Sequence, residues 1–424
     1  MSRIPRSLRA TFARDTSTFA RRWPGKLFVV AVLVAVPAAF LLRSLLGGSY
    51  IDDSWVAVLA AFTLVVAYAF SRRLLVTVLV AALVLGAATL GMTPRVASAH
   101  TGDDALLARL ESERAGGTLS GYRDLAVAKI DLDADTPVRF AGLGADETTR
   151  MEVGSLTKAM TGLVIADAVE RGEIRLDASV STYLPQLHGS EAGTVTMREL
   201  VTHTAGYVAF GPATMARGFW AAPLGRNFFS TEVAQVVEEA RAGTLDTRGT
   251  YVYSTLGAAT AGVAVAAAAG MSYAELMRTR LFEPLGMTAT AVETDRNEVE
   301  GGWSASGLPV EPWVLGAYAA GGGVVSTAHD LAAFATALLD GTAPGLSAMD
   351  PIEAAGADDL RVGMFWHVSE ESAGRTITWH TGQTGGYTTY FGIDRADRTA
   401  VVVLSDVSNP VSSELGRDLL AGQA

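Results

Sequence analysis

Residues 152–162 read EVGSLTKAMTG, and in this stretch Ser155 stands three positions before Lys158. On a helix, positions i and i+3 share a face, so the lysine amine reaches the serine hydroxyl. A serine becomes a nucleophile when a neighbouring base takes its proton, and lysine serves as that base when burial lowers its pKa. A serine at a helix start is also a common N-cap. The stretch alone therefore leaves two alternatives open, an activated nucleophile and an ordinary capped helix.

The scarcity of lysine favours the nucleophile. Only three of the 33 basic residues are lysines, and the other two are Lys26 and Lys129. Arginine stays protonated and cannot act as a base. Most basic residues of this chain are arginines, so Lys158 is one of only three side-chain amines that can lose a proton. The chain has no cysteine, which excludes thiol nucleophiles, disulfides and Cys-ligated zinc.

Charge and histidine spacing exclude further classes of function. Eleven basic and three acidic residues precede residue 100, whereas 22 basic and 41 acidic residues follow, so the net charge of -11 divides into about +8 and about -19. An acidic body without a basic stripe argues against a nucleic-acid partner. The six histidines are scattered, with no spacing that would place ligands on one helix face. We expect no metal site and no cofactor.

Three apolar stretches, 27–42, 55–70 and 74–92, precede residue 100. A helix that crosses the hydrocarbon needs about 20 largely apolar residues. With flanking residues, spans are therefore expected near 27–46, 54–70 and 74–93.

The basic residues around these stretches predict the topology. The N-terminal arm is rich in arginine and the link after the second stretch holds Arg72 and Arg73, so both are expected on the cytoplasmic side. Residues 1–99 then form a multi-pass region of the cell membrane, and residues 100–424 form an extracytoplasmic domain. Two alternatives remain. The sequence VASAH suits a signal peptidase, which would cut near Ala99, and such apolar runs also occur as buried helices of soluble proteins.

From about residue 100 the pattern changes to short strands and amphipathic helices. Strands are predicted at 122–130 and 138–144, and a helix at 155–171 has apolar residues at helical spacing. A helical, glycine-rich middle runs from about 175 to 320. A helix at 326–339, the strand-like segments RVGMFWHV, RTITWH, YTTYFGI and RTAVVVLS, and a terminal helix near 411–421 follow. This order predicts an α+β fold in which an antiparallel sheet flanked by helices carries an inserted helical subdomain.

Seven stretches, in order, resemble the serine β-lactamase and penicillin-binding-protein superfamily. The chain is most similar to the class C β-lactamase-like branch, which includes peptidases and esterases. The resemblance covers about residues 105–420 and implies a β-lactamase/transpeptidase-like fold. The stretches are EVGSLTKAMTG (152–162), RLDASVSTYLP (175–185), ELVTHTAGY (199–207), YSTLG (253–257), LFEPLGM (281–287), AAGGGVVSTAHDLAAFATALLDG (319–341) and WHTGQTGGY (379–387).

The resemblance implies catalytic roles for three residues. Ser155 is expected to be the acylated nucleophile and Lys158 its proton acceptor. Tyr253 matches the tyrosine of the family's YxN motif, and a phenol whose pKa is lowered by Lys158 would relay a proton to the leaving group. The alternative for Tyr253 is a core aromatic. His203, in the THTAG stretch, is expected to be structural.

The resemblance also implies a substrate-binding strand. His380, Thr381 and Gly382 stand where the family has KTG, at the end of RTITWH, which we expect to be an edge strand. The backbone N–H of Gln383 would pair with that of Ser155 to form an oxyanion hole.

Two departures from the family pattern concern the substrate. Thr255 replaces the Asn of YxN, and a hydroxyl cannot present the donor and acceptor of an amide together. His380 replaces the Lys of KTG, so the charge that would hold a substrate carboxylate becomes conditional on pH. Both departures weaken the expectation of β-lactam or D-Ala-D-Ala recognition, while acyl transfer itself is not affected.

We therefore expect a membrane-anchored, extracytoplasmic serine hydrolase that acts through an acyl-enzyme. Its partners would be the membrane and a small-molecule or peptide substrate. The substrate stays open between a D-amino-acid or cell-wall peptide, an ester and a β-lactam, and the oligomeric state also stays open. The alternative, motivated by Thr255, is a non-catalytic, penicillin-binding-like envelope protein with a binding or regulatory role. A transporter is disfavoured, because Arg43 near one end is the charged residue of the spans.

Overall fold

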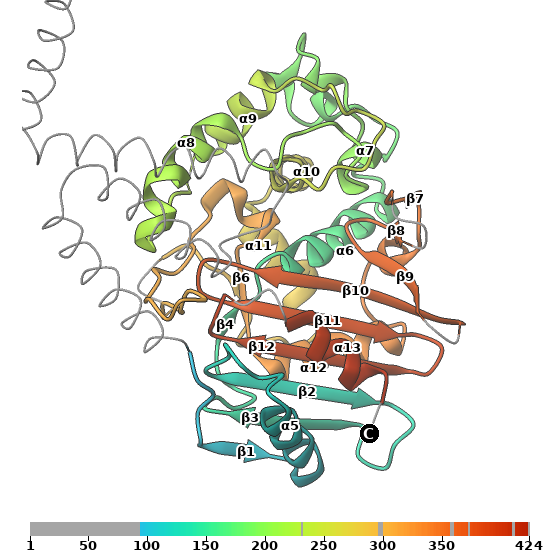
Figure 1. Ribbon diagram of the computed structural model, residues 1–424. Helices are drawn as coiled ribbons and strands as arrows, with labels where there is room; N and C mark the ends of the chain where they lie inside the picture. Colours follow the sequence, from blue (N-terminus) through green and yellow to red (C-terminus); the bar gives the residue numbers. More distant parts are fainter. Residues whose placement is uncertain are drawn as a thin grey trace, which may run out of the picture. The chain divides into compact units, whose positions relative to one another are not determined.

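The computed structural model describes residues 94–229, 232–295, 300–356, 360–371, 374–408 and 412–422. The chain divides into two compact units, Met1–Thr93 and Pro94–Ala424, and the described residues belong to the second (Figure 1). The predicted membrane spans and the basic arm lie outside the described residues. Across the described ranges, no single helix is long and apolar enough to cross a membrane. One pair of helices, Thr255–Ala269 and Tyr273–Phe282, bent by 79°, passes by length and composition together.

A nine-stranded antiparallel sheet is the largest element of the described unit (Figure 1). Its order is β1-β3-β2-β12-β11-β10-β9-β8-β7, so strands from the two ends of the unit meet where β2 pairs with β12. The predicted α+β fold with an antiparallel sheet is confirmed. The strands are β1 (His100–Gly102), β2 (Leu125–Asp131), β3 (Val138–Leu143), β7 (Glu353–Ala354), β8 (Leu360–Val362), β9 (His367–Glu371), β10 (Arg375–Gln383), β11 (Thr388–Asp394) and β12 (Thr399–Ser405).

Helices cover both faces of this sheet, because both alternating sets of side chains along its central strands are apolar. In β2, Leu125 and Val127 pack with α5 (Asp104–Gly116) and α13 (Ser412–Leu420). Ala126 and Ala128 face the opposite way and join the core that contains α6 (Leu156–Glu170) and α12 (Ala328–Leu339). Figure 1 shows α5 and α13 on the near side of the sheet. The sheet therefore separates two hydrophobic cores.

Helix α6 runs through the larger core. Thirteen of its residues, from Leu156 to Ala168, are buried, and a helix that is apolar on nearly all sides belongs in an interior. The segment before it, β4 (Met151–Glu152), forms a small second sheet with β5 (Ala291–Val292) and β6 (Val324–Ser326). Ser155 is thus held between a strand and a buried helix.

Residues 175–320, the expected helical subdomain, contain most of the shorter helices of the described ranges, joined by loops and interrupted by β5. Figure 1 shows α7 to α10 gathered beyond the β10 side of the sheet. The segment contains α7 (Met197–Val201), α8 (Pro212–Ala221), α9 (Val233–Ala242), α10 (Thr255–Ala269), α11 (Tyr273–Met277) and the π-helix η5 (Arg278–Phe282), with short 3-10 helices η1 (Val180–Thr182), η2 (Pro185–Leu187), η3 (Ala192–Thr194), η4 (Ala222–Leu224) and η7 (Gly316–Gly321).

Two details differ from the sequence-based expectations. The segment RVGMFWHV does not form one strand: β8 ends at Val362 and β9 begins at His367. Between them Phe365 has a φ of 66°, which breaks the extended backbone, and its N–H donates to Val201 O. In addition, β10 is not at the edge of the sheet. It lies between β9 and β11, but β9 pairs with it only as far as Trp379.

Candidate active site

Ser155 begins α6 but does not cap it with its side chain. Its backbone is helical, with φ of -64° and ψ of -10°, and its hydroxyl makes no capping hydrogen bond. Lys158 Nζ lies 2.9 Å from Ser155 Oγ instead. Ser155 thus occupies the N-cap position without capping the helix through its side chain, and its hydroxyl is directed to the amine one turn further along the helix.

Lys158 occupies a fully buried position, with 0% of its side chain exposed. Its amine donates to the carbonyl oxygen of Gly321 at 2.5 Å. Burial disfavours the charged amine and lowers the pKa of Lys158 from 10.5 to about 7. Near neutral pH, a large fraction of the amine is therefore unprotonated, with a lone pair available to accept the hydroxyl proton of Ser155.

Tyr253 presents its ring to this amine. Lys158 Nζ lies 4.8 Å from the ring centroid, and the Tyr253 hydroxyl makes a side-chain hydrogen bond with Ser155. The expectation that Lys158 lowers the pKa of Tyr253 is wrong. Burial raises this pKa above its usual value of 10, and the hydrogen bond with Ser155 opposes the rise in part. Because its pKa is raised, Tyr253 stays a neutral phenol and a hydrogen-bond donor.

The pairing pattern of β10 directs the N–H of Gln383 toward the open side of the strand. Thr384 N donates to Tyr387 O across the turn to β11, and hydrogen-bonded positions alternate along an antiparallel pair. Gln383 and Thr388, the next pair along the strands, therefore form a non-hydrogen-bonded pair. The N–H of Gln383 points away from β11. On that side the pairing with β9 has already ended at Trp379.

Two glycines allow this end of β10 to lie against the start of α6. A β-carbon at Gly382 would lie 1.9 Å from Val153 O and 3.3 Å from Ser155 N. A β-carbon at Gly154, where φ is 51°, would lie 2.7 Å from Gln383 N. Only glycine permits this backbone approach. The N–H groups of Ser155 and Gln383 are therefore close to each other, as an oxyanion hole requires.

His380 is buried, with 1% of its surface exposed, and its Nδ1 lies 2.5 Å from Thr381 O. A carbonyl accepts, so Nδ1 carries the proton and Nε2 is an acceptor, which has no hydrogen-bond partner among the described residues. Burial, together with His367 and Lys158, lowers the pKa of His380 well below 6.5. The expected pH-dependent charge is corrected accordingly: the imidazole is neutral at physiological pH.

The remaining predicted site residues contribute mainly through their backbone or by packing. Thr255 is the first residue of α10, is 7% exposed, and its Cγ2 packs against Gly321, the residue that accepts from Lys158. The carbonyl oxygen of Thr381 accepts a hydrogen bond from His380 Nδ1. The Gln383 side chain donates to Ser408 Oγ at 3.0 Å.

Several residues at the site were not expected from the sequence. His367 stacks on His380 with ring centroids 5.1 Å apart. The Tyr251 hydroxyl lies 2.9 Å from Nε2 of His367. His203, considered structural, has a φ of 57°, accepts from Ser254 N through Nδ1 and lies 4.6 Å from the Tyr253 ring. Within the described residues, no group of three potential metal ligands is present. Burial lowers the pKa of His203 well below 6.5 and that of His367 to about 4, so neutral imidazoles surround the Tyr253 ring.

Gly321 and Glu152 were also missed. The run of three glycines at 321–323 was the available signal for Gly321, since such runs permit close backbone approach. Glu152 is 3% exposed, accepts from Trp313 N at 2.5 Å, and burial raises its pKa to about 7. No sequence pattern indicates that burial.

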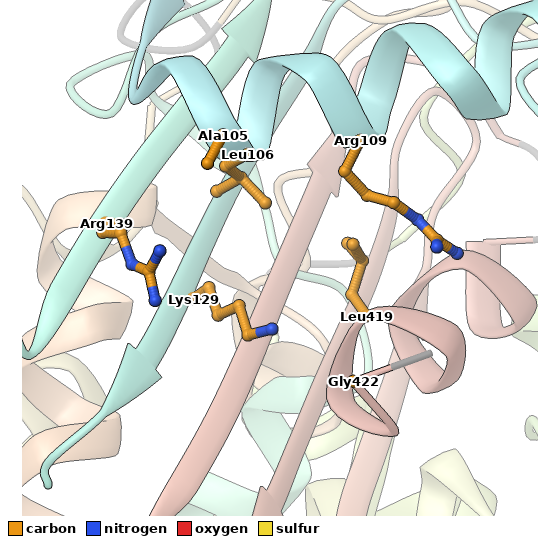
Figure 2. Close-up of a pocket in the computed structure, with 7 residues that line it drawn as sticks. All are labelled: Ala105, Leu106, Arg109, Lys129, Arg139, Leu419 and Gly422. Carbon is orange, nitrogen blue, oxygen red and sulfur yellow. The ribbon is translucent and has the colours of Figure 1, made fainter. Parts of the chain in front are cut away.

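A hollow of about 190 Å³ on the other side of the sheet holds none of these residues (Figure 2). Lys129 and Arg139, which are cross-strand partners in β2 and β3, face it beneath α5. Arg139 contributes to the lowered pKa of Lys129, although burial is the larger cause. This hollow is basic, but it is not part of the Ser155 site.

Comparison with known proteins agrees with this geometry. A family model described as Beta-lactamase matches residues 107–424. The chain is 27% identical to a beta-lactamase of Escherichia coli (strain K12) over 191 residues, 44% of this chain and 47% of that protein. It is 30% identical to Penicillin-binding protein 4 of Amycolatopsis lactamdurans over 219 residues, 49% of this chain and 55% of that protein. The matches thus span about half the length of these curated relatives.

Solved structures share the fold. A class C beta-lactamase from Rhodobacter sphaeroides has a TM-score of 0.62 at 22% identity, and a beta-lactamase/D-alanine carboxypeptidase from Pseudomonas syringae has a TM-score of 0.63 at 20% identity. Each similarity covers 76% of this chain and 99% of the other.

Proposed function

The chain belongs to the beta-lactamase family, and from this premise we propose that it is a serine hydrolase that forms an acyl-enzyme on Ser155. The observation that carries the proposal is the 2.9 Å contact between Ser155 Oγ and the amine of Lys158, whose pKa burial lowers to about 7. A nucleophile and an unprotonated base in contact are what serine acylation requires.

In the acylation step, Ser155 Oγ attacks the carbonyl carbon of the substrate and Lys158 Nζ takes the hydroxyl proton. The negative charge that develops on the carbonyl oxygen is stabilised by the N–H groups of Ser155 and Gln383. Each such donor contributes about 3 to 4 kcal/mol in the transition state. Because Gly154 and Gly382 hold these backbones together, the donors need no rearrangement during the reaction.

Tyr253 supplies the proton for the leaving group. Its phenol keeps its proton, since burial raises its pKa, and it is hydrogen-bonded to Ser155. When the C–N or C–O bond breaks, the phenol donates to the departing atom and is reprotonated from Lys158, which holds the proton of Ser155. Water then attacks the carbonyl carbon of the acyl-enzyme and gives one proton to Lys158. When the bond between this carbon and Ser155 Oγ breaks, that proton passes to Ser155 Oγ and the acid product leaves.

His380 indicates which substrates fit. Burial lowers the pKa of His380 well below 6.5, so this position carries a neutral imidazole where a fixed cation would hold a carboxylate. The favoured substrate is an ester or amide without a carboxylate at this position. Relatives whose names describe beta-lactamases, penicillin-binding proteins and a D-stereospecific amidohydrolase from Streptomyces support acyl transfer in general.

We also propose that residues 1–93 anchor the enzyme in the membrane, with the hydrolase domain outside the cytoplasm. The support is the three apolar stretches and the arginines that flank them. A reporter active only outside the cell, fused after residue 105, is expected to be active. A silent reporter would place the domain in the cytoplasm.

A fluorophosphonate probe tests the acyl-enzyme. It is expected to label the protein, and Ser155→Ala is expected to abolish the labelling, while Ser304→Ala, which changes a serine distant in sequence and without a lysine one turn later, leaves it intact. Persistent labelling of Ser155→Ala would sink the assignment.

A substrate panel tests the role of His380. Pairs of esters and amides that differ by one free carboxylate are expected to show faster hydrolysis of the member that lacks it. A preference for the carboxylate would contradict a neutral His380.

A further inference from the structure

Figure 1 shows α8 and α9 beside each other in the helical subdomain. The large apolar side chains that the described residues expose lie in and beside α8, at the start of α9 and in the loop before η7. We call them the α8 surface: Val208, Met215, Trp220, Leu224, Val233 and Leu308, with exposed fractions between 41% and 71%. The chain that follows Leu308 lies beside the end of η4, because Glu311 N donates to Gly225 O at 2.7 Å.

Helix α8 is fixed in place with its apolar side outward. Thr214 is its one buried residue, and Thr214 N donates to Glu239 Oε1 at 2.6 Å. Arg217 turns inward, where its Nε donates to Phe228 O at 2.9 Å. The inner side is thus anchored by specific hydrogen bonds, while Trp220 stays 67% exposed. Large exposed apolar patches of this kind mark interaction sites.

The charge of this segment is the opposite of the charge of the domain. Residues 208–226 contain no aspartate or glutamate, although the chain carries a net charge of -11. The charged residue that residues 208–226 expose is Arg226, and two exposed acids, Glu232 and Glu311, stand outside this segment at the margin of the α8 surface. Tryptophan and arginine beside aliphatic side chains are the composition of elements that lie at an anionic lipid surface.

The sequence before Pro94 indicates which partner the α8 surface contacts. The last apolar stretch ends at Met92, two residues before Pro94, where the described unit begins. If this stretch spans the bilayer, the domain is tethered at the lipid surface. Tethering raises the effective concentration of the surface, so even a weak apolar contact is populated.

We propose that the α8 surface docks on the lipid bilayer, with Trp220 and Leu224 entering the headgroup boundary and Arg226 pairing with anionic headgroups. The proposal rests on the membrane anchoring proposed above. Docking also fixes the site relative to the lipid, because Val208 O accepts from Ser254 Oγ at 2.7 Å and Ala209 O accepts from Thr255 N at 3.0 Å. The α8 surface is therefore continuous with the segment that carries Tyr253.

Because the chain has no cysteine, a single introduced cysteine can be labelled alone in the full-length protein. Met215→Cys and Leu224→Cys would carry an environment-sensitive fluorophore in vesicles of phosphatidylcholine and phosphatidylglycerol that contain a spin-labelled quencher lipid. Ala396→Cys, in the exposed turn between β11 and β12, is the matched control. Val80→Cys, in the last apolar stretch, reports the anchoring separately.

We expect the lipid quencher to quench the labels at positions 80, 215 and 224. The label at position 396 is expected to stay unquenched. Arg226→Glu is expected to lower the ratio of docked to undocked protein about tenfold in anionic vesicles. Fluorophosphonate labelling of Ser155 in the same vesicles is expected to persist, which separates this proposal from the enzymatic one.

Three outcomes would overturn the proposal. Quenching at 80 without quenching at 215 and 224 would leave the anchor intact and remove the docking. Shielding of 215 and 224 from water without lipid quenching would assign the surface to a protein, including a second copy of this chain. Absence of quenching at all four positions would remove the anchor and the docking together.

Discussion

Replacing Lys158 with methionine is expected to abolish acylation and, at neutral pH, to make the folded domain more stable. Methionine has a similar length, fits buried positions and carries no charge. The native amine must leave water to reach a site with 0% exposure. A charge buried there without a carboxylate partner raises the free energy of the folded state.

The magnitude follows from the pKa of Lys158, which burial lowers from 10.5 to about 7. Between these two values the unfolded chain binds more protons than the folded one, so the stability of the native protein rises with pH in this window. Each pH unit is worth about 1.4 kcal/mol. The buried amine therefore costs the folded state about 4 kcal/mol at pH 7 and about 2 kcal/mol at pH 9.

The methionine variant also loses the hydrogen bond to Gly321 O. A buried acceptor left unsatisfied costs about 1 to 3 kcal/mol, and this cost does not depend on pH. At pH 7 the variant is thus expected to be more stable than the native protein by about 1 to 3 kcal/mol. Its advantage falls by about 2 kcal/mol between pH 7 and pH 9.

Urea unfolding of residues 94–424 at pH 7, 8 and 9 measures this difference. Lys129→Met is the control, because Lys129 is half-buried and its amine is expected to give a smaller pH dependence. If the difference between the methionine variant and the native protein were the same at all three pH values, Lys158 would have equal pKa values in the folded and unfolded states. The assignment of Lys158 as a neutral base would then be refuted.

Four further predictions concern the site and the sheet. The rate of fluorophosphonate labelling is expected to rise about tenfold per pH unit below pH 7 and to level off above it, because the unprotonated Lys158 is the active form; a flat profile from pH 5 to 9 would contradict this. Tyr253→Phe keeps the ring over Lys158 but removes the proton donor, so ester hydrolysis is expected to fall about 10²- to 10⁴-fold in steady-state assays while the urea midpoint hardly changes. In Gly382→Ala, the new methyl meets Val153 O at 1.9 Å and displaces β10 from Ser155; kcat is expected to fall about 100-fold and stability by about 1 to 3 kcal/mol, and a variant with native kcat would remove the oxyanion role of Gln383. Arg139→Glu turns the like-charged cross-strand pair with Lys129 (Figure 2) into an opposite-charged pair and is expected to stabilise the domain by about 0.2 to 1 kcal/mol in urea unfolding, whereas a loss of stability would show that the two cations do not repel.

The elements near the ends of the described unit were the most predictable. Residues 122–130, 138–144 and 155–171 were expected as strand, strand and helix, and the structure has β2, β3 and α6 there. Their periodicity is local, so each segment indicates its own structure. The prediction of one strand for RVGMFWHV was wrong, because the backbone turns at Phe365. The N–H of Phe365 donates to Val201 O, 164 positions earlier in the chain. No local pattern contains such a contact.

The sequence by itself determined the pair of groups that can do the chemistry. Three properties can be read from the sequence: the spacing of Ser155 and Lys158, the scarcity of lysine and the absence of cysteine. Helical geometry brings residues at this spacing into contact. The tertiary structure decided the protonation states. Lys158 loses its charge because segments far away in the sequence exclude water from it, and its partner Gly321 is 163 residues distant. For the same reason Tyr253 keeps its proton and His380 is uncharged, since burial is a sum over long-range contacts that residue spacing does not record.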